Sequence, residues 1–382
     1  MSLTMEPAQR ERLVPEDLLR IAVIDDLALS PRGDLVAMTI RTADMTANRY
    51  YAHLRIVPVD GSPGRTLAEG ERIDHAASWS PDGSRLAFLS DRTGRDQVWL
   101  TTLDGEPRQV TSFPLGVSGQ PAWSPDGRRL VVAAVEEDEP GGGPAPSVAA
   151  DAPPFTVTQM CYRVDGKGYL GTRRQHLWVV EVETAEVTRL TDGPFNDFTP
   201  TWSPDGRQIA FVANRMDERL TEFRSAIWTV PVAGGPARRV TPEEGVAQAP
   251  AWSPDGAELS YRGLLPGSVF APNHHVLLVA ATGEGSPRSL TGGFTGHVGG
   301  SLFSDTWRAG EGPPQLFWTP DGAAVRFLAA DRGRVQVFAV NRAGAVTRLV
   351  GGDRACGMLQ VSDDGQTLVY AAADLVHTPD LY

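Results

Sequence analysis

Short apolar segments follow one another along the whole chain, and each is bounded by turn residues. Leu86–Leu89, Ile209–Val212 and Val325–Leu328 are typical of them. Their length fits β-strands and falls far short of the roughly 20 apolar residues that a membrane-spanning helix needs. Many short apolar segments joined by tight turns predict an all-β protein.

A five-residue motif introduces these segments. It reads Trp-Ser-Pro-Asp-Gly four times and Trp-Thr-Pro-Asp-Gly once, and a degenerate copy lies at each end of the series. The seven copies are Leu29–Gly33, Trp79–Gly83, Trp123–Gly127, Trp202–Gly206, Trp252–Gly256, Trp318–Gly322 and Val361–Gly365. Proline fixes φ at the first central turn position, and glycine supplies a positive φ. Each copy therefore predicts a turn between two antiparallel strands.

Two further strands complete each unit. Third strands are expected at Gln97–Leu100, His176–Val179, Ala226–Thr229 and Val335–Phe338, and fourth strands at Arg108–Thr111, Thr188–Thr191, Arg239–Thr241, Arg288–Thr291 and Arg348–Val350. Four strands in a unit of about 45 residues, repeated seven times, predict a seven-bladed β-propeller with four-stranded antiparallel blades. Eight of the nine tryptophans fall in motifs or third strands, where we expect them to pack between blades; Trp307 is the exception.

The two ends of the repeat differ. The first blade has a full set of predicted strands, Ile24–Leu29, Leu35–Ile40, His53–Val59 and Arg65–Leu67. The last blade has Cys356–Val361 and Thr367–Ala373, and the sequence then ends where a third strand should begin. An incomplete blade leaves an exposed sheet edge, which proteins normally avoid. We therefore expect this chain to be part of a longer protein.

The domain organisation follows from the repeat. Residues 1–20 are expected to form an N-terminal segment with a short helix, and residues 21–382 the propeller. The long interval after the third motif predicts an insertion in blade three over about residues 136–175. This insertion begins acidic and Gly/Pro-rich and becomes aromatic near Tyr162. A second long stretch, Gly292–Pro314, precedes blade six.

Composition and charge narrow the function. The 40 Gly and 30 Pro are explained largely by turns. The net charge of −12 argues against binding to nucleic acid or to an anionic membrane surface. Cys161 and Cys356 have no metal-ligand spacing and are interpreted as reduced thiols. The N-terminal residues contain no apolar signal-peptide core, so we expect a cytoplasmic protein. A homo-oligomer remains compatible with all of this.

Catalytic and metal-binding motifs are absent from the sequence. Gly116–Gln120 and Gly299–Phe303 each lack the second glycine of a G-x-S-x-G nucleophile elbow, and neither precedes a helical pattern. His274 and His275 are adjacent in a predicted strand, so their side chains should point to opposite faces. We therefore predict no catalytic residue, no metal site and no cofactor in this chain.

Three segments outside the repeat motif carry a family resemblance. They are Val14–Leu19 before the first blade, Tyr162–Tyr169 in the insertion and Pro379–Tyr382 at the exit. With the motif series, they make the whole chain resemble the propeller of the prolyl oligopeptidase family of serine peptidases, especially its acylaminoacyl-peptidase-like branch. The resemblance implies a propeller that covers an α/β-hydrolase domain with a Ser-Asp-His triad and admits only peptides. That hydrolase domain is absent from these 382 residues.

The insertion holds the candidate binding residues. Arg163, Arg173 and Arg174 are candidates for binding a peptide carboxylate or carbonyl group, and surface charge or a salt bridge to the hydrolase domain is the alternative. Glu136–Glu139 would grip a substrate amino terminus, as acidic residues do in dipeptidyl peptidases of this family, or would form a solvated loop.

The leading hypothesis is a non-catalytic propeller module of a prolyl-oligopeptidase-like serine peptidase. It would gate peptide access and act as a scaffold for the hydrolase domain of the same parent chain. The alternative is a free-standing Tol-type propeller that binds a protein partner. A propeller enzyme acting on a sugar or lactone through channel carboxylates is a third reading, but no carboxylate pair in the sequence supports it.

Overall fold

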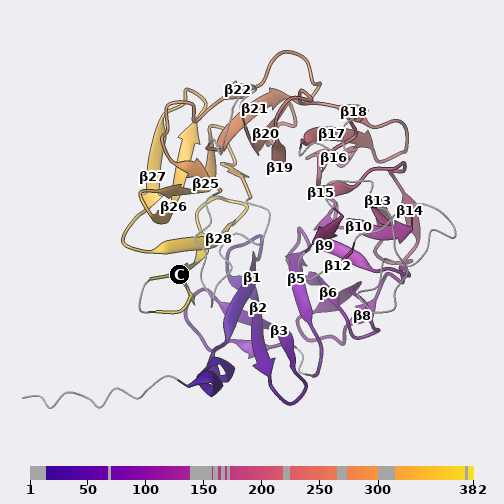
Figure 1. Cartoon of the computed structure of the whole chain (residues 1–382), viewed down its shortest axis with the longest axis vertical. Helices are drawn as coiled ribbons and strands as arrows, with labels where there is room; N and C mark the ends of the chain where they lie inside the picture. Colours follow the sequence, from indigo (N-terminus) through magenta and orange to yellow (C-terminus); the bar gives the residue numbers. More distant parts are fainter. Residues whose placement is uncertain are drawn as a thin grey trace, which may run out of the picture.

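The computed structural model describes residues 14–67, 70–137, 173–217, 224–264, 273–299, 315–374 and 377–382, together with Val157, 162–164 and 168–169. Five four-stranded antiparallel sheets and one eight-stranded sheet, which holds blades six and seven together, stand around a central axis in chain order (Figure 1). The first strand of each blade lies nearest the axis. The predicted all-β, seven-bladed propeller is confirmed.

The first four blades have four strands each. Blade one contains β1 (Val23–Leu29), β2 (Leu35–Asp44), β3 (Arg49–Pro58) and β4 (Arg65–Thr66). Blade two contains β5 (Asp74–Trp79), β6 (Arg85–Ser90), β7 (Gln97–Thr102) and β8 (Arg108–Gln109). Blade three contains β9 (Val117–Trp123), β10 (Arg129–Glu137), β13 (Arg173–Glu181) and β14 (Val187–Arg189). Blade four contains β15 (Asp197–Trp202), β16 (Gln208–Ala213), β17 (Ala226–Pro231) and β18 (Arg238–Arg239).

Blade five is also four-stranded, and only the last two blades are less regular. Blade five contains β19 (Ala247–Trp252), β20 (Glu258–Gly263), β21 (His275–Ala280) and β22 (Arg288–Ser289). Blade six contains β23 (His297–Val298), β24 (Phe317–Trp318), β25 (Ala324–Asp331), β26 (Arg334–Asn341) and β27 (Val346–Val350). Its first strand is split, because β23 and β24 both pair with β25. Blade seven contains β28 (Ala355–Val361), β29 (Leu368–Ala373) and the short β30 (Asp380–Leu381).

The last blade is incomplete, as predicted. In the described part of the chain β30 pairs with β29, and no strand from the first blade joins this sheet. The ring closes instead through side-chain packing, where Leu27 and Val36 of blade one meet Val369 and Ala371 of blade seven. The parallel contact between Val335 and Ala355 joins blade six to blade seven.

Two small elements lie outside the blades. The predicted N-terminal helix is a 3₁₀-helix, η1 (Pro15–Arg20), which packs against β2. The Val14 amide donates to the Asp17 carboxylate at 3.0 Å, which satisfies a donor at the start of η1. The insertion contributes the short hairpin of β11 (Arg163–Val164) and β12 (Gly168–Tyr169). Tyr162, directly before it, is exposed, and residues 158–161 and 165–167 lie outside the described residues. No helix in the described ranges is long and apolar enough to cross a membrane.

The motif tryptophans connect consecutive blades. Each donates its indole N–H to a main-chain carbonyl oxygen in the first strand of the preceding blade. The five bonds run from Trp79 to Ala28, Trp123 to Ser78, Trp202 to Ala122, Trp252 to Thr201 and Trp318 to Ala251, over 2.9 to 3.3 Å. The third-strand tryptophans differ in this bond: among the described residues, the indole N–H groups of Trp99, Trp178 and Trp228 have no hydrogen-bond partner. An arginine stacks on each of these rings, as it also does on three of the motif tryptophans.

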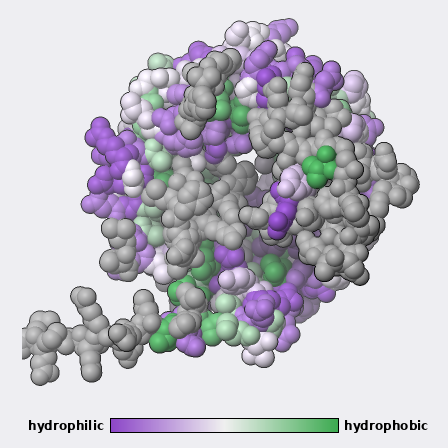
Figure 2. Space-filling view, in the orientation of Figure 1, coloured by the Kyte–Doolittle hydropathy of each residue, from purple (hydrophilic) through white to green (hydrophobic). Residues whose placement is uncertain are grey.

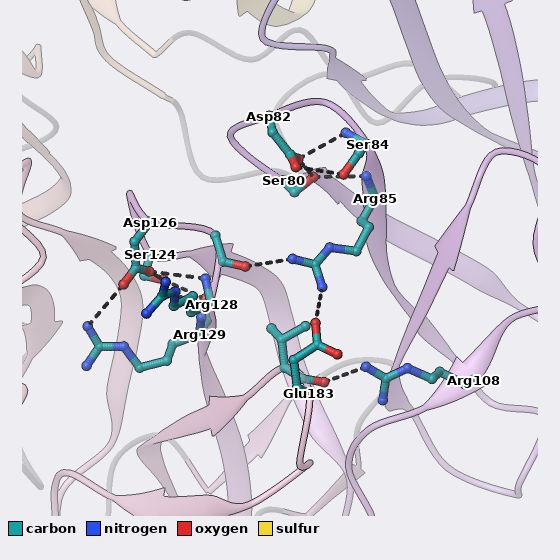
Figure 3. A network of polar contacts seen from close by, with 12 residues as sticks. Ser80, Asp82, Ser84, Arg85, Arg108, Ser124, Asp126, Arg128, Arg129 and Glu183 are labelled. Carbon is teal, nitrogen blue, oxygen red and sulfur yellow. Dashed lines mark hydrogen bonds and ion pairs between the residues drawn. The ribbon is translucent and has the colours of Figure 1, made fainter.

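The motif turns also stack on one another around the ring. In each turn the serine or threonine hydroxyl donates to the aspartate, as Ser124 does to Asp126 at 2.6 Å (Figure 3). Gly127 has φ of +67°, and a Cβ added there would lie 3.5 Å from Pro81 of the preceding turn. In blade seven Asp363 replaces this proline, and its free N–H donates to the Pro31 carbonyl at 3.0 Å. The turns therefore help to close the ring between blades seven and one.

These turns predict a loss of stability in acid. The Ser80 hydroxyl, with the Ser84 amide and hydroxyl, lowers the pKa of Asp82 from 3.8 to about 2. The same hydroxyl bond lowers the pKa of Asp126, Asp205 and Asp255. A carboxyl whose pKa is lower in the folded state stabilises the protein fully above 3.8 and less as the pH falls towards 2.

We therefore expect Asp82→Asn to flatten the fall in unfolding free energy between these pH values, measured by urea unfolding at a series of pH values. Asp104→Asn is the control, because the Asp104 side chain is 95% exposed and its loss should leave the pH dependence unchanged. An unchanged slope in Asp82→Asn would contradict the assigned role of this carboxylate.

Candidate functional site

The candidate site residues lie at the end of the ring opposite the motif turns. Each first strand runs into its motif turn, so its beginning lies at the other end, beside the connections between second and third strands. The insertion of blade three joins β10 to β13 and therefore leaves the ring at this end. Figure 2 shows the described surface in the orientation of Figure 1, with hydrophobic residues gathered where η1 meets blade one.

The predicted binding arginines are only partly brought together. Arg173 and Arg174 begin β13, directly across from Glu137 and Glu136 of β10. Arg174 also donates to the Arg173 carbonyl at 2.9 Å. Arg163 is exposed in the separate hairpin of β11 and β12. The two β13 arginines thus stand in a ladder of opposite charges, which stabilises paired strands. Their role in substrate binding stays a prediction.

The acidic run that begins at Glu136 is described only as far as Glu137. The Glu136 carboxylate forms an ion pair with Arg189 at 3.0 Å, and the guanidinium of Arg189 stacks on Trp178 at 5.8 Å. Asp138 and Glu139 lie outside the described residues. This contact attaches Glu136 to its own blade, and a grip on a substrate amino terminus stays a prediction.

A second polar cluster joins blades five and six, and its members are Arg262, His274 and His297. The Arg262 Nε–H donates to Nδ1 of His274 at 3.0 Å, and an Nη1–H donates to the Gly299 carbonyl at 3.4 Å. The main-chain N–H of His274 donates to Nδ1 of His297 at 3.3 Å. The two imidazole rings lie 4.9 Å apart between centroids.

These bonds fix the protonation of both histidines. Because Nδ1 accepts a hydrogen bond in each ring, both imidazoles are neutral and carry their proton on Nε2. Burial and the nearby Arg262 charge lower the pKa of His274 to about 3, and burial with the same charge lowers the pKa of His297. Burial lowers the pKa of Arg262 to about 10, so its guanidinium is still charged at neutral pH.

His275 faces away from this cluster. Its Nδ1 lies 3.2 Å from the Thr291 carbonyl oxygen of its own blade, and Gln97 of blade two donates to the Phe113 carbonyl in a similar place. The two adjacent histidines therefore point to different surroundings, as expected for a strand. Among the described residues, no group of three metal-ligating side chains is present.

A third cluster lies between blades one and two. His75 of β5 contacts Asp96 through Nε2 and Oδ2 at 3.1 Å. Burial lowers the pKa of His75, but the bond to Asp96 and the charges of Asp96 and Asp26 outweigh it and raise the pKa above the usual value. Burial raises the pKa of Asp26 to about 6. The acids of this cluster therefore favour the protonated form of His75, and His75 opposes the effect of burial on Asp26.

The two serine segments do not form a nucleophile elbow. Val117–Gln120 lies inside β9, whereas an elbow requires a sharp turn from a strand into a helix. Gly299 follows β23, and Gly300–Phe303 lies outside the described residues. Cys356 is buried and free, and burial raises the pKa of its thiol to about 11, which makes it unreactive. Cys161 lies outside the described residues.

Comparison with known proteins connects this architecture to peptidases. The family described as "TolB beta propeller domain" matches residues 36–141. An uncharacterized peptidase of Bacillus subtilis, YuxL, is 28% identical over 207 residues, which cover 54% of this chain and 32% of that protein. The chain superposes on the acylaminoacyl peptidase of Pyrococcus horikoshii with a TM-score of 0.71 and 16% identity, over 95% of this chain and 51% of that one. This chain is related to peptidase propellers.

A second solved structure matches at full length. The propeller domain of the trilobed protease from Pyrococcus furiosus, which has an open velcro topology, superposes with a TM-score of 0.62 and 14% identity over 94% of each chain. At these identities the superpositions establish the fold alone. The chain spans about half of the acylaminoacyl peptidase and a smaller share of YuxL. The resemblance to acylaminoacyl-peptidase-like propellers, predicted from sequence, is confirmed.

Proposed function

We propose that this propeller is the non-catalytic part of a serine peptidase, in which it covers an α/β-hydrolase domain and restricts entry to peptides. The observation that carries the proposal is the extent of the match: nearly all of this chain superposes on about half of an acylaminoacyl peptidase. The described residues form seven blades around one axis, the last of them incomplete.

The surface around η1 suits such a partner domain. Val14 is 49% exposed beside η1, and Met45 and Tyr50 of the long β2–β3 hairpin are 70% and 57% exposed. The hydrophobic area in Figure 2 lies at this border of the ring. Exposed apolar side chains of this kind favour contact with another domain. The cytoplasmic location predicted from the sequence is part of the same proposal.

The test compares three samples: this propeller alone, the hydrolase domain alone, and the assembly of the two. We expect the purified chain to hydrolyse no acyl-peptide. A hydrolase domain alone should cleave long unfolded chains as well as short peptides, whereas the assembly should cleave only short peptides. The measurement is the rate of cleavage over a series of substrates, from acylated dipeptides to an unfolded protein. Hydrolysis by this chain alone, lost on changing one serine, would overturn the proposal, and so would an unchanged length dependence.

The match to TolB-type propellers favours a second candidate, a module that binds a protein partner without any hydrolase. The two candidates differ in what the chain associates with. A stable complex with a protein of another class, formed in preference to a hydrolase domain and detected by size-exclusion chromatography, would favour this second function.

A further inference from the structure

Arg262 breaks the pattern of the structural repeat. Arg262 of β20 lies opposite Gln248 of β19, in the second residue pair counted from the start of β19. At the same position of the other blades, counted from the motif turn, Leu89, Ala133, Val212 and Ala371 are buried and apolar, Leu328 is half-buried and apolar, and Thr39 is buried and polar but uncharged. A charged group in place of an apolar one weakens the packing of the strand. A residue of this kind is retained more readily for binding than for the fold.

The Arg262 guanidinium also lacks an acid. In blades two and four, the half-buried or buried arginines pair with carboxylates, Arg92 with Asp74 at 3.0 Å and Arg215 with Asp197 at 2.8 Å. Within the described ranges Arg262 contacts only an imidazole and a carbonyl group, both neutral. A partly buried positive charge without a counter-ion is unfavourable, and an anion from solution would remove this cost.

The groups around Arg262 are donors. Two of the five guanidinium N–H groups are used, which leaves three. Both Nδ1 atoms of the histidine pair accept, so each ring presents an Nε2–H, and neither has a partner among the described residues. Asp and Glu side chains are absent from these contacts. The cluster therefore offers hydrogen-bond donors and one positive charge, which suits a planar anion.

We propose that Arg262, His274 and His297 form a binding site for the carboxylate group of a peptide, at the junction of blades five and six. A carboxylate matches the planar fork of the guanidinium and takes two parallel hydrogen bonds from it. The peptide source of this carboxylate rests on the proposed peptidase function; the anion site itself does not. The site is at the end of the ring where the blade-three insertion leaves it, at the start of β21 and the end of β20.

Binding is tested on this chain alone, without any hydrolase domain. Three ligands are titrated separately: trialanine as the free acid, trialanine as the C-terminal amide, and sodium acetate. The readout is the shift of the imidazole C–H signals of His274 and His297 in NMR titrations, assigned with His274→Asn and His297→Asn. We expect saturable shifts with the free acid and at least about tenfold weaker binding of the amide, since a charge-assisted hydrogen bond is lost.

Arg262→Leu introduces the apolar residue type that five of the other six blades have at this position, so it should fold, which circular dichroism verifies. It should weaken binding of the free acid about tenfold or more, and Arg262→Gln should act in the same direction. Arg207→Gln removes the charge of an 85% exposed arginine elsewhere and should leave binding unchanged. Equal binding of acid and amide, unaltered binding by Arg262→Leu, or no saturable shift would overturn the site. Equal affinity for acetate and trialanine would overturn the peptide assignment while the proposed gating function is tested separately.

Discussion

Replacing Asp197 with alanine should lower the free energy of unfolding by about 3–5 kcal/mol, because it leaves a buried arginine without its partner. Asp197 is fully buried at the start of β15, and Arg215 binds both of its carboxylate oxygens, at 2.8 and 2.9 Å. The Arg215 side chain is 11% exposed and stacks on Trp228 at 5.4 Å. Its charge therefore cannot reach water without disturbing the blade.

The measurement is urea unfolding followed by tryptophan fluorescence. The double variant Asp197→Ala, Arg215→Leu removes both charges and should recover most of the loss, since two apolar residues replace a buried ion pair at little cost. Asp104→Ala is the matched control: this carboxylate also pairs with an arginine, Arg65 at 3.1 Å, but is 95% exposed. Its loss should cost no more than about 1 kcal/mol. Equal losses at the two positions would contradict the burial argument.

The pairing of Asp197 with Arg215 bears on the roles of the tryptophans, which the sequence showed only in part. Asp74 and Arg92 repeat the arrangement in blade two, with Arg92 stacked on Trp99 at 4.3 Å. The tryptophans of motifs and third strands were predicted to share one role, packing between blades. They divide in two, because a motif indole N–H donates to a carbonyl of the preceding blade, whereas a third-strand indole N–H has no partner among the described residues. Only the register of the strands reveals this difference.

The motif predicted the number of blades, their order and the incomplete last blade, since turn chemistry is local and repeats in the sequence. The candidate site was harder to predict. Arg262 follows Ser260 and Tyr261 in a segment that reads as an ordinary strand, and its departure from the repeat appears only when residues of different blades are aligned by register. The sequence also does not predict the positive φ angles of Ala76, Thr199 and Ala249 in the first strands. Alanine and threonine do not signal a left-handed backbone.

Replacing Trp202 with alanine should cost about 3–5 kcal/mol of unfolding free energy, and replacing it with phenylalanine about 1–2 kcal/mol. Trp202 is 7% exposed and packs against residues of blades three and four, among them Val131 and Phe211. Its indole N–H donates to the Ala122 carbonyl at 2.9 Å. Alanine removes both the packing and the bond, whereas phenylalanine keeps much of the packing and leaves the carbonyl unpaired.

Trp99→Phe is the control that separates the contribution of the indole hydrogen bond from that of the aromatic ring. Trp99 is a third-strand tryptophan whose N–H has no partner, and phenylalanine preserves an aromatic face for Arg92, so the loss should stay below about 1 kcal/mol. Urea unfolding of the three variants gives the comparison. If Trp202→Phe cost no more than Trp99→Phe, the indole bonds would add nothing, and packing alone would hold consecutive blades together.

A larger loss at Trp202 would mean that the first six blades are linked by indole hydrogen bonds that the junctions of blade seven lack. Val361 and Leu29 occupy the tryptophan position at those junctions. Those two junctions would then depend on turn contacts and apolar packing, together with the parallel pairing of Val335 and Ala355 between blades six and seven.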